Sequence, residues 1–165
     1  MDEIDRRIIG SIQADGSLTY AEIGPAVGLA ASSVNDRLKR LRSEGVVRPM
    51  TAEIDPVAVD LKLLAFILVV IEDGTAEADF RAAMKAAPEV LECHHVTGEF
   101  SYLLKLRLRD TAQLERFLME RLKAVRGVGR TQTLIALSSS KETHILSAPL
   151  TGDVVGPVPK SDRNA

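Results

Sequence analysis

The fold of the N-terminal third is decided by residues 19–47, TYAEIGPAVGLAASSVNDRLKRLRSEGVV. Thr19 and Glu22 have the spacing of a capping box, in which each side chain bonds the backbone N–H of the other residue. A helix is therefore expected to begin after Thr19 and to end at Gly28, with its last turn distorted by Pro25. Residues 28–30 leave room only for a tight turn before the next periodic segment.

That next segment predicts a helix over 31–44. Val34, Leu38 and Leu41 form one apolar stripe, and Gly45 stands where a left-handed cap is expected. The opposite face is polar, and residues 31–43 contain four basic side chains and one acidic side chain. Such a face can contact phosphates and base edges, although a solvated surface would have the same composition.

A third helix is expected before these two, because isoleucines recur at helical spacing and Asp2 can cap the segment. These residues are Ile4, Ile8, Ile9 and Ile12. Three short helices with a tight turn between the last two are typical of a DNA-binding helix-turn-helix. Residues 46–47 and 51–54 are β-prone and predict the two short strands of a wing.

The second half alternates between strand and helix patterns. Strands are expected over 62–72, 90–97, 100–109 and 128–138, and helices over 76–87 and 111–124, with Thr75 and Thr111 as candidate caps. The order βαββαβ predicts a ferredoxin-like domain, an antiparallel sheet with two helices on one face. The whole chain is thus expected to be α+β.

Residues 63–71 are all apolar, unlike those of a strand with one solvated face. The second face of this strand needs a cover. We expect the same sheet of another subunit in a symmetric dimer, and the alternative is the C-terminal tail.

Several runs resemble the Lrp/AsnC family of leucine-responsive, or feast/famine, regulators of bacteria and archaea. The N-terminal runs are DEIDRRII (2–9), YAEI (20–23), VGL (27–29) and EGVV (44–47), with the pairs Ser33-Val34, Arg37-Leu38 and Arg40-Leu41. ECHHVTGEFSYLLK (92–105) is similar to the effector loop of the family's sensing domain, often called RAM. The resemblance extends from residue 2 to about residue 150, and it implies a winged helix-turn-helix followed by a RAM domain.

Carried over residue by residue, the resemblance implies two sets of functional side chains. The DNA-facing set is Ser32, Ser33, Asn35, Asp36, Arg37, Lys39 and Arg40. The effector-binding set is Gly98, Glu99, Phe100, Ser101 and Tyr102, with Thr131, Thr133, Ser138, Ser139 and Ser140 as additions. The implied partners are a pseudo-palindromic double-stranded operator, further copies of the chain in a dimer or a ring such as an octamer, and a small effector, typically an amino acid, bound between dimers.

The sequence departs from the family pattern at three places, and at one of them Pro25 replaces a more usual basic or polar helix residue. Ala30-Ala31 replaces Ser-Pro, so the DNA-facing helix lacks the usual hydroxyl cap. Ser101 replaces an aspartate that could pair with the ammonium of a ligand. Three alternatives stay open: Glu99 substitutes for it, the ligand differs, or no ligand binds.

The remaining observations set limits on the class of protein. The expected division is a DNA-binding domain (1–55), a linker (56–61), a sensing domain (62–146) and a largely mobile tail (147–165). One cysteine, Cys93, fits a reducing cytoplasm. No membrane span is expected, because the longest apolar run has nine residues. His94 and His95 should point to opposite faces of a strand, so no metal site and no cofactor are expected.

Two alternatives remain open on the sequence. Sirohaem decarboxylases resemble this family and share its two-domain layout, and the adjacent histidines keep that reading available. A co-regulator that oligomerises and senses a ligand without reading DNA is the other. No nucleophile–base pair or phosphate-binding glycine loop is present, so we expect a regulator and not an enzyme.

Overall fold

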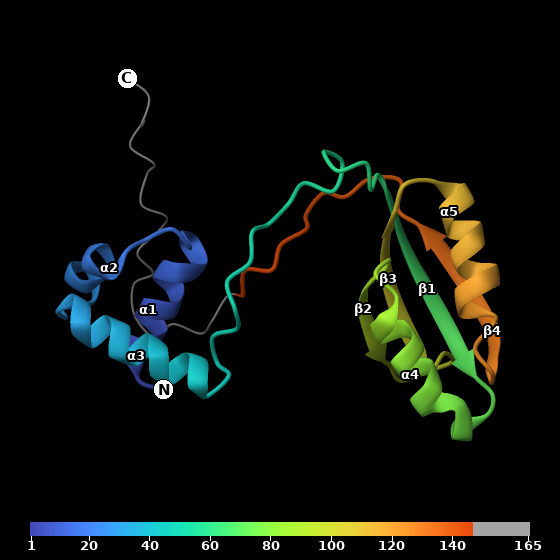
Figure 1. Cartoon of the computed structure of the whole chain (residues 1–165), viewed down its shortest axis with the longest axis horizontal. Coiled ribbons are helices and arrows are strands. Elements are labelled where there is room, and N and C mark those ends of the chain that lie inside the picture. Colours follow the sequence, from blue (N-terminus) through green and yellow to red (C-terminus); the bar gives the residue numbers. More distant parts are fainter. Residues whose placement is uncertain (147–165) are drawn as a thin grey trace. The chain divides into compact units, whose positions relative to one another are not determined.

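A computed structural model describes residues 1–146, and the predicted tail over 147–165 lies outside the described residues. The described residues divide into two compact units, one comprising Met1–Ala52 with residues 142–146, and one comprising Glu53–Lys141 (Figure 1). Within the described part, no helix is both long and apolar enough to cross a bilayer.

The N-terminal unit contains the three expected helices, α1 (Glu3–Ala14), α2 (Tyr20–Val27) and α3 (Ala31–Ser43). Both expected caps are present: Asp2 caps α1 and Thr19 forms a capping box with Glu22. Gly28 ends α2 with a φ of 70°, a left-handed conformation that glycine adopts without steric cost. Helix α2 continues two residues beyond Pro25. Ala30 precedes α3 without a side-chain cap, as the sequence predicts.

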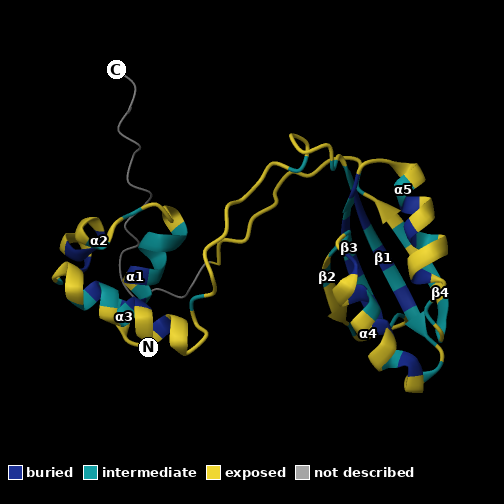
Figure 2. Cartoon of the chain, viewed as in Figure 1, coloured by how far each residue is buried: buried dark blue, intermediate teal, exposed yellow. Residues whose placement is uncertain are grey.

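The core of this unit is built from one apolar stripe of each helix. Its buried members are Ile8 from α1, Ile23 and Val27 from α2, and Val34 and Leu38 from α3. Because the stripe of α3 faces inward, its polar residues are left on the outside of the unit, where Figure 2 shows exposed positions along the helix.

The expected wing strands are absent from the described residues, because no strand is formed over 46–54. The amides of Val46 and Val47 both donate to the Leu41 carbonyl at the end of α3, so they are unavailable for strand pairing. Pro49 has no backbone donor. The β-propensity of these valines is therefore outweighed by helix termination.

The C-terminal unit has the predicted βαββαβ order. Its strands are β1 (Leu63–Ile71), β2 (Val90–His95), β3 (Tyr102–Leu108) and β4 (Val128–Ile135). They form one antiparallel sheet in the order β2-β3-β1-β4, so β2 and β4 are its edges.

Two helices cover one face of this sheet. Helix α4 (Glu77–Ala86) follows a short 3-10 turn, η1 (Gly74–Ala76), and α5 (Thr111–Arg116) continues as a π-helical segment, η2 (Phe117–Leu122). The caps predicted at Thr75 and Thr111 were misplaced, because Asp73 accepts the Thr75 backbone N–H and Asp110 accepts the Gln113 backbone N–H instead. Carboxylates one or two residues earlier fulfil this role better than a threonine hydroxyl inside the turn.

The two faces of β1 differ in burial. Ala65, Ile67 and Val69 are fully buried beneath the helices. They share one core with Phe80 of α4 and Phe117 of η2. The other face carries Leu64, Phe66, Leu68 and Val70 from β1, and Phe66 and Leu68 keep intermediate exposure. Leu103 and Leu134 extend that face on the neighbouring strands. This second set is called the open face below.

Candidate DNA-binding and effector sites

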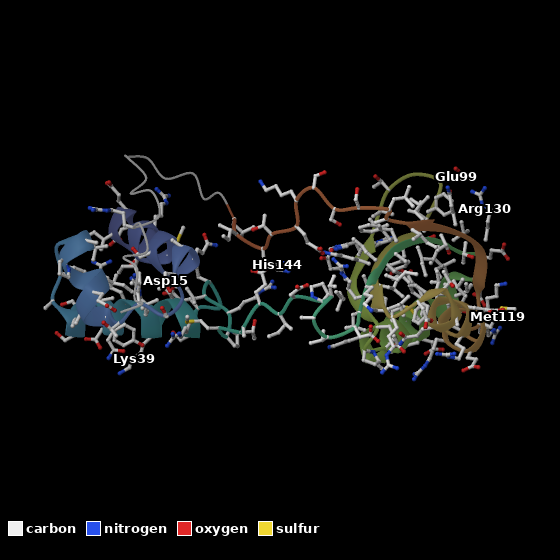
Figure 3. All side chains as sticks on the ribbon, turned by 90° about the horizontal axis from the view of Figure 1, so that it is seen from above. Asp15, Lys39, Glu99, Met119, Arg130 and His144 are labelled. Atoms are coloured by element: carbon white, nitrogen blue, oxygen red, sulfur yellow. The ribbon has the colours of Figure 1, made fainter. Side chains whose placement is uncertain are left out.

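The outer side of α3 presents several residues of the predicted DNA-facing set. Ser32, Asp36 and Lys39 are exposed, and Ser33 and Asn35 are partly buried at its flanks. Lys39 makes no ion pair among residues 1–146, and Figure 3 shows its side chain extending away from the helices. This surface offers hydroxyl, amide and ammonium groups, which are donors suited to phosphates and base edges.

The two arginines of the set contact helix α1. Arg37 Nη1 lies 2.6 Å from Asp2 Oδ2 and 2.8 Å from Asp5 Oδ1. Arg40 Nη2 lies 2.6 Å from Asp5 Oδ2. Both guanidinium groups still reach solvent, because their side chains are 28% and 48% exposed. They therefore link α3 to α1 and keep part of their surface at the outside of the unit.

Asp5 is the only charged side chain of the described residues that is fully buried. Burial alone would raise its pKa, but the Asp2 backbone N–H and the Arg37 guanidinium both donate to the carboxylate. The net effect is a pKa below the ordinary value of 3.8. Asp5 is thus held as an anion that orients the two arginines.

Sequence reasoning assigned Asp2 only to a helix cap and missed the contacts that Asp2 and Asp5 make with α3. A signal was available, because the two acids are three residues apart on α1 and the two arginines are three residues apart on α3. Residues at that spacing share one helix face. When two helices pack with the acidic pair of one facing the basic pair of the other, ion pairs can form between them.

The loop between β2 and β3 is shaped by backbone bonds around Ser101. Val96 N–H donates to the Ser101 carbonyl, and Ser101 N–H donates to the Val69 carbonyl. Gly98 in the turn has a φ of 116°, which disfavours any other residue. The Ser101 hydroxyl accepts a bond from Ile71 N–H at 3.1 Å, at the bulge where the register of β1 against β4 shifts.

Glu99 and Arg130 form an ion pair at the same end of the sheet, and Figure 3 shows the two side chains next to each other. The Arg130 guanidinium also lies over the Phe100 ring, 4.8 Å from its centroid. Arg130 was not among the predicted residues, although its neighbour Thr131 was. The pair is exposed and joins one cation to one anion, the two charges that an amino acid carries.

Three of the other predicted effector residues, Tyr102, Thr131 and Thr133, belong to strands of the sheet. Tyr102 is buried, and its hydroxyl donates to Glu77 Oε1 at 2.5 Å. Burial and this hydrogen bond raise the pKa of Tyr102 to about 12. Thr131 and Thr133 pair with Val69 and Ile67 in the sheet. The sequence 138–140 follows the opposite end of β4, so within one subunit these three serines are not brought to the loop.

The Cys93, His94 and His95 run does not converge on one point. His94 pairs with Leu103 on the open face and bonds Glu92, whereas the exposed His95 stacks on Tyr102, on the face that the helices cover. The two histidines therefore point to opposite faces, as predicted. Desolvation raises the pKa of the Cys93 thiol, so its surroundings favour the neutral thiol over the thiolate.

Two family models match this chain. Residues 1–48 match a winged helix-turn-helix DNA-binding model, and residues 64–146 match the Lrp/AsnC ligand binding domain. Among curated proteins, the transcriptional regulator FL11 of Pyrococcus horikoshii is 36% identical over 87% of this chain and 93% of its own. The leucine-responsive regulatory protein of Salmonella typhimurium is 33% identical, covering 88% of this chain and 90% of that protein.

Solved structures give the same result. A transcriptional regulator of Neisseria meningitidis in complex with L-methionine superposes with a TM-score of 0.83 and 36% identity, covering 92% of this chain and 97% of that one. The leucine response regulatory protein of Mycobacterium tuberculosis superposes with a TM-score of 0.77 and 34% identity, over 86% and 96% of the two chains.

Proposed function

The chain belongs to the Lrp/AsnC family of transcriptional regulators, and we propose that it binds a pseudo-palindromic operator through α3 and responds to an amino acid at the loop over 96–101. The observation that carries the first half is the orientation of α3. Its apolar stripe of Val34, Leu38 and Leu41 is buried, so its polar face is free to enter a major groove. We also propose that the protein acts in the cytoplasm, where the chromosomal DNA of bacteria and archaea lies.

Within α3 we assign different roles to the members of the DNA-facing set. Ser32, Asp36 and Lys39 lie on the exposed ridge and are proposed to reach the duplex directly. Arg37 and Arg40 are proposed to contact phosphates with the parts of their guanidinium groups that Asp2 and Asp5 leave exposed. Ser33 and Asn35, at the flanks, complete the set.

We propose that the open face is covered by the same face of a second subunit. Phe66, Leu68, Leu103 and Leu134 form an apolar centre there, and Lys105 and Arg107 of β3 border it. An apolar centre with a charged border is the composition of an isologous interface. A dimer would present two copies of α3 to successive major grooves, and dimers could assemble into a ring such as an octamer.

For the effector we propose an amino acid held by the Glu99–Arg130 pair. Arg130 can exchange Glu99 for the ligand carboxylate, and Glu99 can then accept the ligand ammonium. The regulator of Neisseria meningitidis with bound L-methionine supports this class of ligand. Residues 138–140 of another subunit are the proposed additional contacts, since a site between dimers can join surfaces that one chain keeps apart. Binding there would change how the DNA-binding units are spaced.

The enzyme alternative is set aside, because the relatives that match nearly the whole chain are transcriptional regulators. The direct test is a gel-shift titration of the full chain with the DNA upstream of its own gene, at low and at physiological salt. We expect a shift at low salt that weakens as salt rises. Failure to shift any candidate operator at low salt would contradict DNA binding.

A further inference from the structure

Asp2 and Asp5 both bind Arg37, but they do so from different environments. Asp5 is fully buried and uses one carboxylate oxygen for each arginine. Asp2 is 53% exposed, and its Oδ2 is the atom that contacts Arg37, at 2.6 Å. Its Oδ1 accepts the backbone N–H of Asp5 and so caps α1. The Asp2–Arg37 bond is therefore the exposed half of the cluster and the half that an incoming anion can replace.

A DNA phosphate and the Asp2 carboxylate are alternative partners for the same guanidinium. Both are oxyanions that bind arginine through charge-assisted hydrogen bonds. The Arg37 guanidinium holds the pKa of Asp2 below its ordinary value, so Asp2 is charged wherever DNA binding is measured. A phosphate approaching Arg37 must displace this carboxylate or remain close to it, and like charges at that range repel.

We infer that Asp2 competes with DNA phosphate for Arg37 and thereby lowers the affinity of this protein for any duplex. The inference rests on the proposed DNA-binding function. It assigns Asp2 a role beyond capping α1: a carboxylate that limits sequence-independent binding. Asp5 does not share this role, because it is buried and remains bound to both arginines.

The chain offers variants that separate this role from capping and from net charge. Asp2→Asn and Asp2→Ser keep a good N-cap, but both remove the negative charge, and serine is too short to reach Arg37. Glu3→Gln is the matched control. It removes one charge from the same turn of α1, at an exposed residue that makes no side-chain bond to α3 among those found in residues 1–146.

The experiment measures dissociation constants of the full chain for an operator duplex and for an unrelated duplex across a salt series. We expect both Asp2 variants to bind both duplexes about 3–10-fold more tightly than wild type, with a salt dependence steeper by up to about 0.9 in the log–log slope, as for one more phosphate contact. Glu3→Gln should change affinity less than two-fold. Melting temperatures of all variants verify that the cap is retained.

Each outcome either supports or overturns the inferred competition between Asp2 and DNA phosphate for Arg37. Asp2 variants that bind like Glu3→Gln, or more weakly than wild type, would overturn the inference while leaving DNA binding intact. A wild-type protein that binds neither duplex at low salt would overturn both the inference and the proposed function. Tighter binding by Asp2→Asn and Asp2→Ser alike, with Glu3→Gln unchanged, supports a local competition at Arg37.

Discussion

The Ser101 hydroxyl accepts a hydrogen bond from the backbone N–H of Ile71, 3.1 Å away, at the bulge of β1. Bulges leave a backbone group without its strand partner, and here a side chain from the adjoining loop supplies one. The residue that departs from the family pattern in the effector loop thus has a structural function. Recognition of a ligand ammonium would then depend on another carboxylate nearby, for which Glu99 is the candidate.

Ser101→Ala should destabilise the sensing domain and leave its ligand affinity within two-fold of wild type. Removing the hydroxyl leaves the Ile71 amide without this acceptor, which costs about 1 kcal/mol of unfolding free energy. Urea denaturation measures the loss, and a ligand titration of the same variant measures affinity. Thr97→Ala, an exposed position in the same loop, is the control. A lost ligand response at unchanged stability would show that Ser101 contacts the effector.

Glu99→Gln and Arg130→Gln should each weaken amino-acid binding by about ten-fold or more, because each removes one of the two charges that complement a zwitterion. A thermal-shift screen of the twenty amino acids on wild type first identifies the ligand. Glu115→Gln, an exposed acid on α5, is the control and should keep the full shift. If all three variants respond like wild type, the Glu99–Arg130 pair does not bind the effector.

Lys39→Gln and Arg40→Gln should both weaken operator binding but differ in stability. Lys39 has no ion pair among the described residues, so its loss should cost one phosphate contact, reduce the salt slope by about 1 and leave the melting temperature unchanged. Arg40→Gln leaves one oxygen of the buried Asp5 without its cation and should also lower the unfolding free energy, by about 1–3 kcal/mol. Equal melting temperatures for the two variants would argue against the Asp5–Arg40 contact.

The N-terminal unit should lose stability in acid through Asp5. Its pKa is lower in the folded chain than the ordinary 3.8, so folding favours the charged carboxylate. This stabilisation is complete above pH 3.8 and is lost as the pH falls below that value. Asp5→Asn should be less stable than wild type at neutral pH, by about 2 kcal/mol, and should flatten the decline in acid. Denaturation followed by circular dichroism from pH 7 to pH 3 tests both expectations.

The elements of the fold could be predicted because their signals are local. The Thr19–Glu22 capping box, Gly28 and the period of Val34 and Leu38 each act within a few residues, and the structure has the helices they predict. The wing strands could not be judged in this way. Whether Val46 pairs with a second strand or closes α3 depends on competition for one amide, and its β-propensity does not measure that competition.

The candidate sites were predictable as positions on helices and loops but not as sets of contacts. The polar face of α3 could be predicted from the helical spacing of its apolar residues. The contacts of Arg37 and Arg40 with Asp5, by contrast, depend on how α1 packs against α3. Arg130 lies 31 residues from Glu99, and the two meet only because β4 joins the sheet beside β1. Pairings of this kind require the tertiary fold.

The π-helical segment Phe117–Leu122 has a consequence for the length of this helix. In a π-turn, bonds link residues five apart, so Phe117 and Leu122 both face the sheet, at 2% and 0% exposure. The turn holds one residue more than an α-helical turn would. Met119, 58% exposed, lies in this turn and carries none of the core packing. We therefore expect that deleting Met119 lets this helix wind regularly while Phe117 and Leu122 stay in the core.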